Sequence, residues 1–182
     1  INGTSTASVW WQFPMGEASS LVLSRIVKYS STLISLNIHC IIPPAGALAL
    51  AEALKVNRTL TYLEFRLNKI PVPGVLAIAE SLTFNDTLAK LEISNNDIAD
   101  AGAQALAEAL KVNRTLTDLE VRCNKISYAG AQALADALKS NSTLTGLNIH
   151  DNTISDVGAQ AFAEALKVNR RLASLQVGCN MI

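Results

Sequence analysis

The sequence predicts an α/β solenoid, a horseshoe arc with a parallel β-sheet on the concave face and helices on the convex face. A spacing of 28 residues separates the asparagines at Asn68, Asn96, Asn124, Asn152 and Asn180. Each one closes the same frame, L-x-x-L-x-[hydrophobic]-x-x-N, which begins at Leu60, Leu88, Leu116, Leu144 and Leu172. A unit of this length cannot bury its own apolar face, so successive copies must stack.

Each unit has the same expected order of elements. A short strand comes first, as at 116–121, because alternate apolar residues there point inward. The asparagine and an isoleucine two residues later turn the chain, and a glycine lies at the start of a helix such as 101–111. In that helix Ala103, Leu106 and Leu110 fall at i, i+3 and i+7, which predicts one buried face. The helix leaves through K-V-N-R-T, whose asparagine tolerates the left-handed conformation that often ends a helix.

The N-terminal part departs from this pattern. The first repeat starts at Leu33 and is one residue shorter than the others, with Cys40 in the asparagine position. Upstream, the pattern predicts a helix at 17–29, and residues 8–14 fit either a degenerate strand or the remains of a cap.

This divides the chain into two parts. Residues 1–32 form a degenerate N-terminal repeat or cap remnant with one helix. Residues 33–182 contain five full units of about 28 residues and a sixth strand. Because a solenoid usually ends in a cap with a polar outer face, and no such cap follows, we expect a fragment of a longer chain.

The repeated frame is the leucine-rich-repeat signature. The string G-A-Q-A-L-A-E-A-L-K at 102–111 resembles the ribonuclease-inhibitor type of this repeat, and more narrowly the repeats of NOD-like receptors. The resemblance covers about residues 33–182 and implies a role such as ligand sensing or autoinhibition. Related repeats also occur in Ran GTPase-activating proteins.

Composition narrows the classes of partner. With 15 basic and 15 acidic residues and no basic cluster, the chain is not expected to bind nucleic acid or a membrane surface. No apolar run reaches the roughly 18 residues of a membrane span, and no signal peptide is visible. Cys123 and Cys179 lie two repeats apart, at a predicted Cα separation of roughly 10 Å, beyond the reach of a disulfide. We therefore expect reduced thiols and a cytoplasmic location.

Two asparagine patterns are expected to be structural. The asparagine of each frame would bond to backbone groups of its own and the neighbouring turn, forming a ladder. Four internal N-x-[ST] sites, at Asn57, Asn85, Asn113 and Asn141, follow from the repeat itself, where asparagine ends a helix and threonine precedes a strand. A fifth site begins at Asn2. Glycosylation of these sites would require secretion.

Positions that break the period hold the information about function. On the concave face the strands present an acidic central stripe, Glu64, Glu92 and Glu120, with Arg66 and Arg122 as expected counter-charges. The face either neutralises itself or receives a basic segment of a partner protein, with Tyr62, Arg66 and Arg122 as anchors. The predicted partner-binding residues are Tyr62, Glu64, Arg66, Lys90, Glu92, Asp118, Glu120, Arg122, Asn148 and His150.

The sequence predicts no enzyme, no metal site and no cofactor. His39 and His150 are about four strands apart, roughly 20 Å, too far to share an ion. On an open face nothing holds a substrate or excludes water from paired glutamates. The expected function is a non-catalytic protein–protein interaction module. Two alternatives stay open: a GTPase-activating regulator resembling the Ran activator, and a structural subunit of a large assembly.

Overall fold

The computed structural model describes residues 7–11 and 15–181, in which strands and helices alternate along the chain. The strands are β1 (Ala7–Trp11), β2 (Leu33–Ile38), β3 (Tyr62–Phe65), β4 (Lys90–Glu92), β5 (Asp118–Glu120), β6 (Gly146–Asn148) and β7 (Ser174–Gln176). The helices are α1 (Glu17–Tyr29), α2 (Pro44–Val56), α3 (Val72–Leu82), α4 (Ala99–Val112), α5 (Tyr128–Ser140) and α6 (Asp156–Val168).

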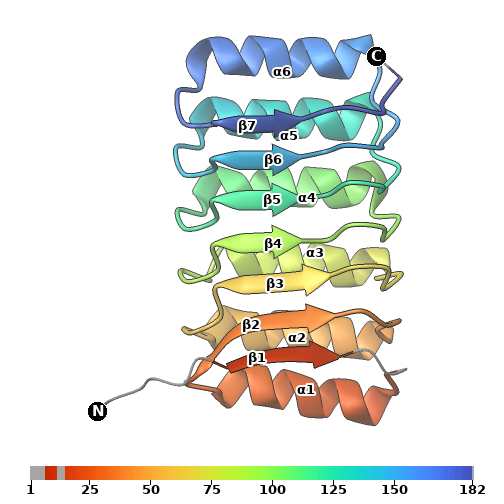
Figure 1. Cartoon of the computed structure of the whole chain (residues 1–182), viewed down its shortest axis with the longest axis vertical. Coiled ribbons are helices and arrows are strands. Elements are labelled where there is room, and N and C mark those ends of the chain that lie inside the picture. The colour runs from red at the N-terminus through yellow and green to blue at the C-terminus, as the bar shows by residue number, and fades with distance from the viewer. Residues whose placement is uncertain (1–6, 12–14, 182) are drawn as a thin grey trace.

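All seven strands lie in one parallel sheet, in the order in which they occur in the chain. The helices form a second layer against one face of that sheet, and α1 and α6 lie at opposite ends of the stack (Figure 1). The predicted α/β leucine-rich-repeat solenoid is therefore confirmed.

The core lies between the two layers. The frame leucines fill it from the sheet side, and Leu63, Leu91 and Leu119 are each completely buried at paired positions. From the helix side Ala103, Leu106 and Leu110 are also completely buried, which confirms the predicted helix face. Small alanines allow the helices to lie close to the strands.

The helix glycines serve close packing between repeats, not a turn. A Cβ atom added at Gly130 would lie 2.7 Å from Asp100 Oδ1 and 2.9 Å from the Ala103 Cβ atom of the preceding helix. No glycine among the described residues has a positive φ. The left-handed positions belong to residues beside the frame asparagines, such as Leu67 and Lys69 on either side of Asn68.

The frame asparagines bind the turns of neighbouring repeats to one another. Asn96 Nδ2 donates to the backbone oxygens of Phe65 at 2.7 Å and Ser94 at 2.9 Å. Its Oδ1 accepts from the backbone N–H groups of Asn68 and Ile70, both at 3.2 Å. One side chain thereby pairs four buried backbone groups, and Asn124 and Asn152 repeat the arrangement.

The ladder is incomplete where the first repeat is irregular. Asn68 Nδ2 donates to Ile38 O at 2.6 Å, but the buried Asn68 Oδ1 has no hydrogen-bond partner in the described part of the chain. In later repeats the equivalent oxygen binds two N–H groups of the preceding turn. That turn here holds Cys40 and lacks one residue, so its N–H groups do not meet the amide.

The asparagines at the helix ends form a second ladder, on the side opposite the first. They were expected to adopt a left-handed conformation, and this is wrong: Asn57 has φ −67° and ψ 137°. Each uses its Nδ2 to bind the preceding repeat, as Asn113 does to Leu82 O at 2.8 Å. The need for that contact, not tolerance of positive φ, explains the asparagine.

The N-terminal segment contains a strand. Residues Ala7–Trp11, for which a degenerate strand and a cap remnant were both open, form β1 and pair in parallel with β2. Residues 12–14 of that segment, and the N-x-[ST] site at Asn2, lie outside the described residues.

The three cysteines, Cys40, Cys123 and Cys179, are free thiols.

Candidate functional site

The ten predicted partner-binding residues fall into three columns across the sheet. Strand pairing places Glu64, Glu92, Glu120 and Asn148 in the central column. A second column contains Tyr62, Lys90 and Asp118, each two positions before the glutamate of the same strand. The third group, Arg66, Arg122 and His150, lies one or two positions after the ends of β3, β5 and β6. Because neighbouring strands are about 4.8 Å apart, each column is a row of closely spaced side chains.

Two of the three central carboxylates already have partners. Glu64 Oε1 lies 2.7 Å from His39 Nε2, and Glu64 Oε2 accepts from the Tyr62 hydroxyl at 2.7 Å. Glu120 Oε1 forms a 2.6 Å ion pair with Lys90 Nζ, which also lies 5.5 Å from the centre of the Tyr62 ring. Burial and Glu64 raise the pKa of the Tyr62 hydroxyl far above its usual range, so it donates at any physiological pH.

The prediction that Arg66 and Arg122 pair with the acidic stripe is wrong. Neither Arg66 nor Arg122 forms an ion pair within 4 Å in the described part of the chain; instead Lys90 pairs with Glu120, and His39 forms a hydrogen bond with Glu64. The arginines follow the ends of β3 and β5. Lys90 starts β4 and reaches diagonally across to β5.

Glu92, at the middle of the stripe, has no hydrogen bond or ion pair to any described residue, although it is only 7% exposed. Loss of hydration raises the pKa of this carboxyl, and the charges of Glu120 and Glu64 raise it further. Lys90 and Arg122 act in the opposite direction, as smaller influences. The site therefore contains a glutamate, itself largely buried, between two others, and its carboxylate has no donor among the described residues.

Two further polar atoms near Glu92 lack partners. Ser94, two residues beyond Glu92, is fully buried, and its hydroxyl has no partner among the described residues. The same is true of the buried Nε of Arg122. Unpaired buried polar groups cost about 1–3 kcal/mol each, so this part of the face is not arranged for stability alone.

We predict that Glu92→Gln stabilises the protein at neutral pH. The pKa of Glu92 is higher in the folded chain than its ordinary value of 4.5, so folding favours the protonated form. The contribution of Glu92 to the free energy of unfolding is therefore fully present below its ordinary pKa, and it is lost as pH rises through the raised pKa of the folded chain. The urea midpoint of Glu92→Gln should exceed that of the wild type at pH 7, and the difference should disappear below about pH 4.

A suitable control is Glu108→Gln, because Glu108 lies on the exposed helix surface and, among the described residues, pairs only with Lys111, at 2.6 Å. This change should shift stability by no more than about 0.5 kcal/mol. A wild type that is more stable than Glu92→Gln at pH 7 would show that Glu92 is paired in solution.

The list of predicted partner-binding residues leaves out several residues of this face. His39 binds Glu64 and packs edge-on against the Trp10 ring, with centroids 5.5 Å apart. Trp10 pairs with Asn37 at the head of the central column. Strand position placed His39 at the head of the column of Arg66 and Arg122, whereas Trp10 lies in a segment that does not follow the repeat frame. Gly146, Ser174 and Gln176 border a hollow beside Asp118 and Glu120.

Other kinds of site find little support in the described ranges. No three His, Cys, Asp or Glu side chains there gather closely enough to hold a metal ion. None of the helices in those ranges is both long and apolar enough to cross a membrane. Cys123 Sγ lies 3.1 Å from Asp151 Oδ2, and burial together with that carboxylate raises the pKa of the thiol. This is the opposite of the change that activates a nucleophilic cysteine.

Comparisons with known proteins agree with the fold. Residues 66–153 match the family model described as the TMOD/LMOD leucine-rich domain. Curated protein sequences give no match. The solved structure of Leiomodin-1 Actin-Binding Site 2 is similar, with a TM-score of 0.65 and 29% identity, covering 73% of this chain and 78% of that one.

A second solved structure, the tropomodulin C-terminal domain of Caenorhabditis elegans, superposes with a TM-score of 0.66. It covers 85% of this chain and 93% of its own, at 14% identity, a likeness that concerns the fold alone. The strand order, the repeat frame and these comparisons together show that the chain is a leucine-rich-repeat domain of the α/β solenoid type.

Proposed function

We propose that this protein is a non-catalytic interaction module that binds another protein through its concave face, and that actin is its partner. The observation that carries the proposal is Glu92, a carboxylate held at the centre of the face without a donor. A basic side chain of a partner would supply that donor. Such charge-assisted hydrogen bonds contribute about 1.5–3 kcal/mol.

The surroundings of Glu92 suit such a contact. His39 and Tyr62 hold Glu64 in place, and Lys90 holds Glu120, so little side-chain entropy is lost when a partner binds. Tyr62 and the two arginines, Arg66 and Arg122, offer the side-chain types that are enriched at binding hot spots. The face is open, which fits protein recognition better than capture of a small substrate.

The choice of actin rests on similarity. The Leiomodin-1 structure is that of an actin-binding site, and 29% identity over 73% of this chain supports a related role. We give this similarity precedence over the resemblance to NOD-like receptors, which depends on short repeat strings. A cytoplasmic location belongs to the same proposal, because three free thiols suit a reducing compartment.

Binding to actin can be measured directly. The 182-residue chain would be tested against filaments by co-sedimentation and against monomeric actin by fluorescence anisotropy. We predict that wild type binds in at least one assay and that Glu92→Gln weakens binding about tenfold, or about 1.4 kcal/mol. Salt should weaken binding too, because screening acts on charged contacts.

The control is again Glu108→Gln, which removes one negative charge from the helical face and should leave the affinity within twofold. Equal losses of affinity in Glu92→Gln and Glu108→Gln would show that binding depends on the net charge of the protein and not on the concave face. A wild-type protein that binds neither form of actin would exclude actin as the partner. If Glu92→Gln were to gain stability while losing affinity, the carboxylate would serve binding at the expense of folding.

A further inference from the structure

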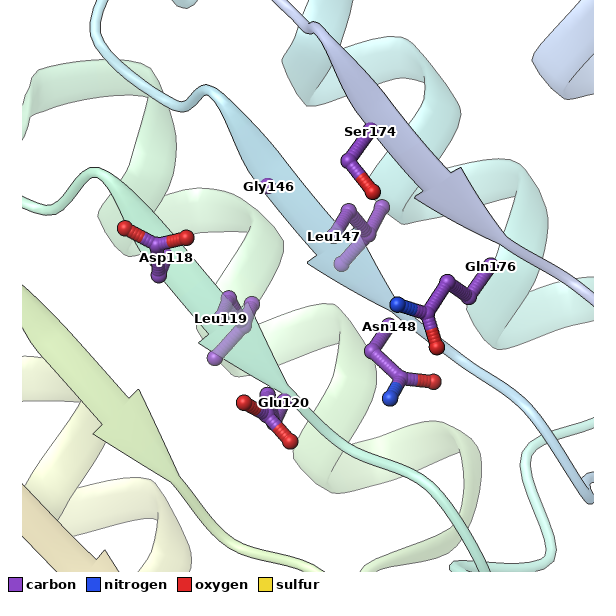
Figure 2. Close-up of a pocket in the computed structure, with 8 residues that line it drawn as sticks. All are labelled: Asp118, Leu119, Glu120, Gly146, Leu147, Asn148, Ser174 and Gln176. Atoms are coloured by element: carbon purple, nitrogen blue, oxygen red, sulfur yellow. The ribbon is translucent and has the colours of Figure 1, made fainter.

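A hollow lies on the strand face where β5, β6 and β7 meet. It measures about 150 Å³ and is bordered by Asp118, Glu120, Gly146, Asn148, Ser174 and Gln176, together with the strand positions of Leu119 and Leu147. Figure 2 shows the side chains of Asp118 and Glu120 on one side and those of Asn148 and Gln176 on the other. The hollow adjoins the acidic stripe but lies beyond Glu92, toward the C-terminal end of the sheet.

Gly146 creates this space. Its strand neighbours in the same column are Asp118 and Ser174, and the column continues to Lys90 and Tyr62 on the far side of Asp118. A Cβ atom added at Gly146 would lie 2.5 Å from Asp118 Oδ1. The Asp118 carboxylate therefore leans over the glycine, and any larger residue would push it out of its present position.

The polar groups around the hollow retain free hydrogen-bonding atoms. Asp118 Oδ2 accepts from Thr117 Oγ1 at 2.8 Å, which leaves Oδ1 without a partner among the described residues. Glu120 Oε1 pairs with Lys90, and Glu120 Oε2 likewise has no partner among the described residues. Asn148 Oδ1 accepts from the His150 N–H at 3.0 Å. The Gln176 amide has no bond within the described part of the chain and can turn its oxygen inward.

We propose that this hollow receives the guanidinium group of one arginine from the partner protein. The proposal rests on the function proposed above and names one contact of that interface. Asp118 and Glu120, at alternate positions of one strand, both line the space, and among the described residues only Glu120 has a cation partner, Lys90. The remaining negative charge disfavours a phosphate or carboxylate ligand.

Arginine fits better than lysine for geometric reasons. A guanidinium is flat and donates in a fixed fork, so it can bind two carboxylate oxygens and an amide oxygen at once. An ammonium group is a compact point charge that keeps its hydration. A shallow, open hollow whose acceptors stand on opposite sides favours the broad, flat group.

The hollow can be tested without knowing the partner. Backbone amide NMR shifts of the 182-residue chain would be followed during titration with N-acetyl-arginine methylamide. We expect saturable shifts at Gly146, Asn148 and Gln176, at least fivefold weaker binding of the lysine analogue, and no shifts with the neutral citrulline analogue.

Two variants change the hollow in different ways. Gly146→Val adds a side chain that strands accept and displaces the Asp118 carboxylate, whereas Asp118→Asn removes the charge alone at nearly constant shape. Both should abolish the arginine shifts. Gly178→Val should retain them, because a Cβ at that position meets only the His150 ring, 3.0 Å from Nδ1. Unchanged shifts in Gly146→Val and Asp118→Asn, or no shifts in the wild type, would overturn the proposal.

The same variants distinguish this inference from the proposed function. If wild type binds actin and Gly146→Val binds at least tenfold more weakly while Gly178→Val does not, the hollow belongs to the interface. If the wild type, Gly146→Val and Gly178→Val bind actin equally, the hollow takes no part in the interface. The inference then fails, while the proposed function stands. If none binds actin but arginine shifts persist at the hollow, the partner is wrong and the arginine contact is right.

Discussion

Replacing Asn124 with alanine should lower the free energy of unfolding by about 3 kcal/mol, because one side chain pairs four buried backbone groups. Asn124 Nδ2 donates to Ile93 O at 2.7 Å and Arg122 O at 3.1 Å. Its Oδ1 accepts from the N–H groups of Asn96 at 2.9 Å and Ile98 at 3.5 Å. Asn124 is completely buried, so water cannot replace these partners without opening the turn. Urea denaturation followed by circular dichroism would measure the loss.

Asn68→Ala is the matched control within the same ladder. Asn68 is equally buried and donates to Ile38 O at 2.6 Å and Arg66 O at 2.8 Å, but its Oδ1 has no partner among the described residues. The alanine variant should therefore lose about half as much stability as Asn124→Ala. Equal losses would mean that the acceptor half of the amide contributes nothing, and that the ladder acts through its donors alone.

Asn113→Ala should cost about 2–4 kcal/mol, although Asn113 sits in a surface turn that matches a glycosylation site. Its Nδ2 donates to Leu82 O at 2.8 Å and Asn85 O at 3.1 Å, both in the preceding repeat. Its Oδ1 accepts from the N–H groups of Thr115 at 3.0 Å and Leu116 at 2.8 Å. The side chain is 4% exposed. The same urea titration would measure this change.

Arg114→Ala provides the comparison from the same turn. Arg114 is exposed, and within the described part of the chain its guanidinium donates only to carbonyl oxygens at the end of α4, so its loss should cost no more than about 0.5 kcal/mol. A stability of Asn113→Ala close to that of Arg114→Ala would contradict a structural role for the second ladder.

The second ladder also bears on the N-x-[ST] sites. A glycan would be attached to Nδ2, the atom that Asn57, Asn85, Asn113 and Asn141 each use to bind the preceding repeat. Asn169 makes the same contact to Leu138 O at 2.7 Å, yet it is followed by two arginines and forms no such site. The asparagine is therefore explained by its contact between repeats, and the threonine is not required for it.

The sequence predicted the fold well because its period is a direct consequence of stacking. The frame leucines, the helix face at Ala103, Leu106 and Leu110, and the parallel order of the strands all follow from one repeat unit. The helix ends were predicted wrongly because K-V-N-R-T looks like a local capping signal. The structure shows a contact with the preceding repeat, about 28 residues earlier in the chain, which no local rule describes.

The concave face was predictable in outline only. Strand position identified the three columns, since register follows from the repeat. Which charges meet depends on how far each side chain reaches: Lys90 crosses to the next strand, whereas Arg66 and Arg122 form no close pair in the described ranges. The hollow depends on the Asp118 carboxylate leaning over Gly146, a conformation that a single sequence does not specify.

The two asparagine ladders run along opposite sides of the solenoid, and each connects successive units to one another. The junction between β2 and β3 is the weakest link of the first ladder, because Asn68 contributes only its donor half there. We therefore expect this junction to open before the junctions around Glu92 when the solenoid is stretched along its axis.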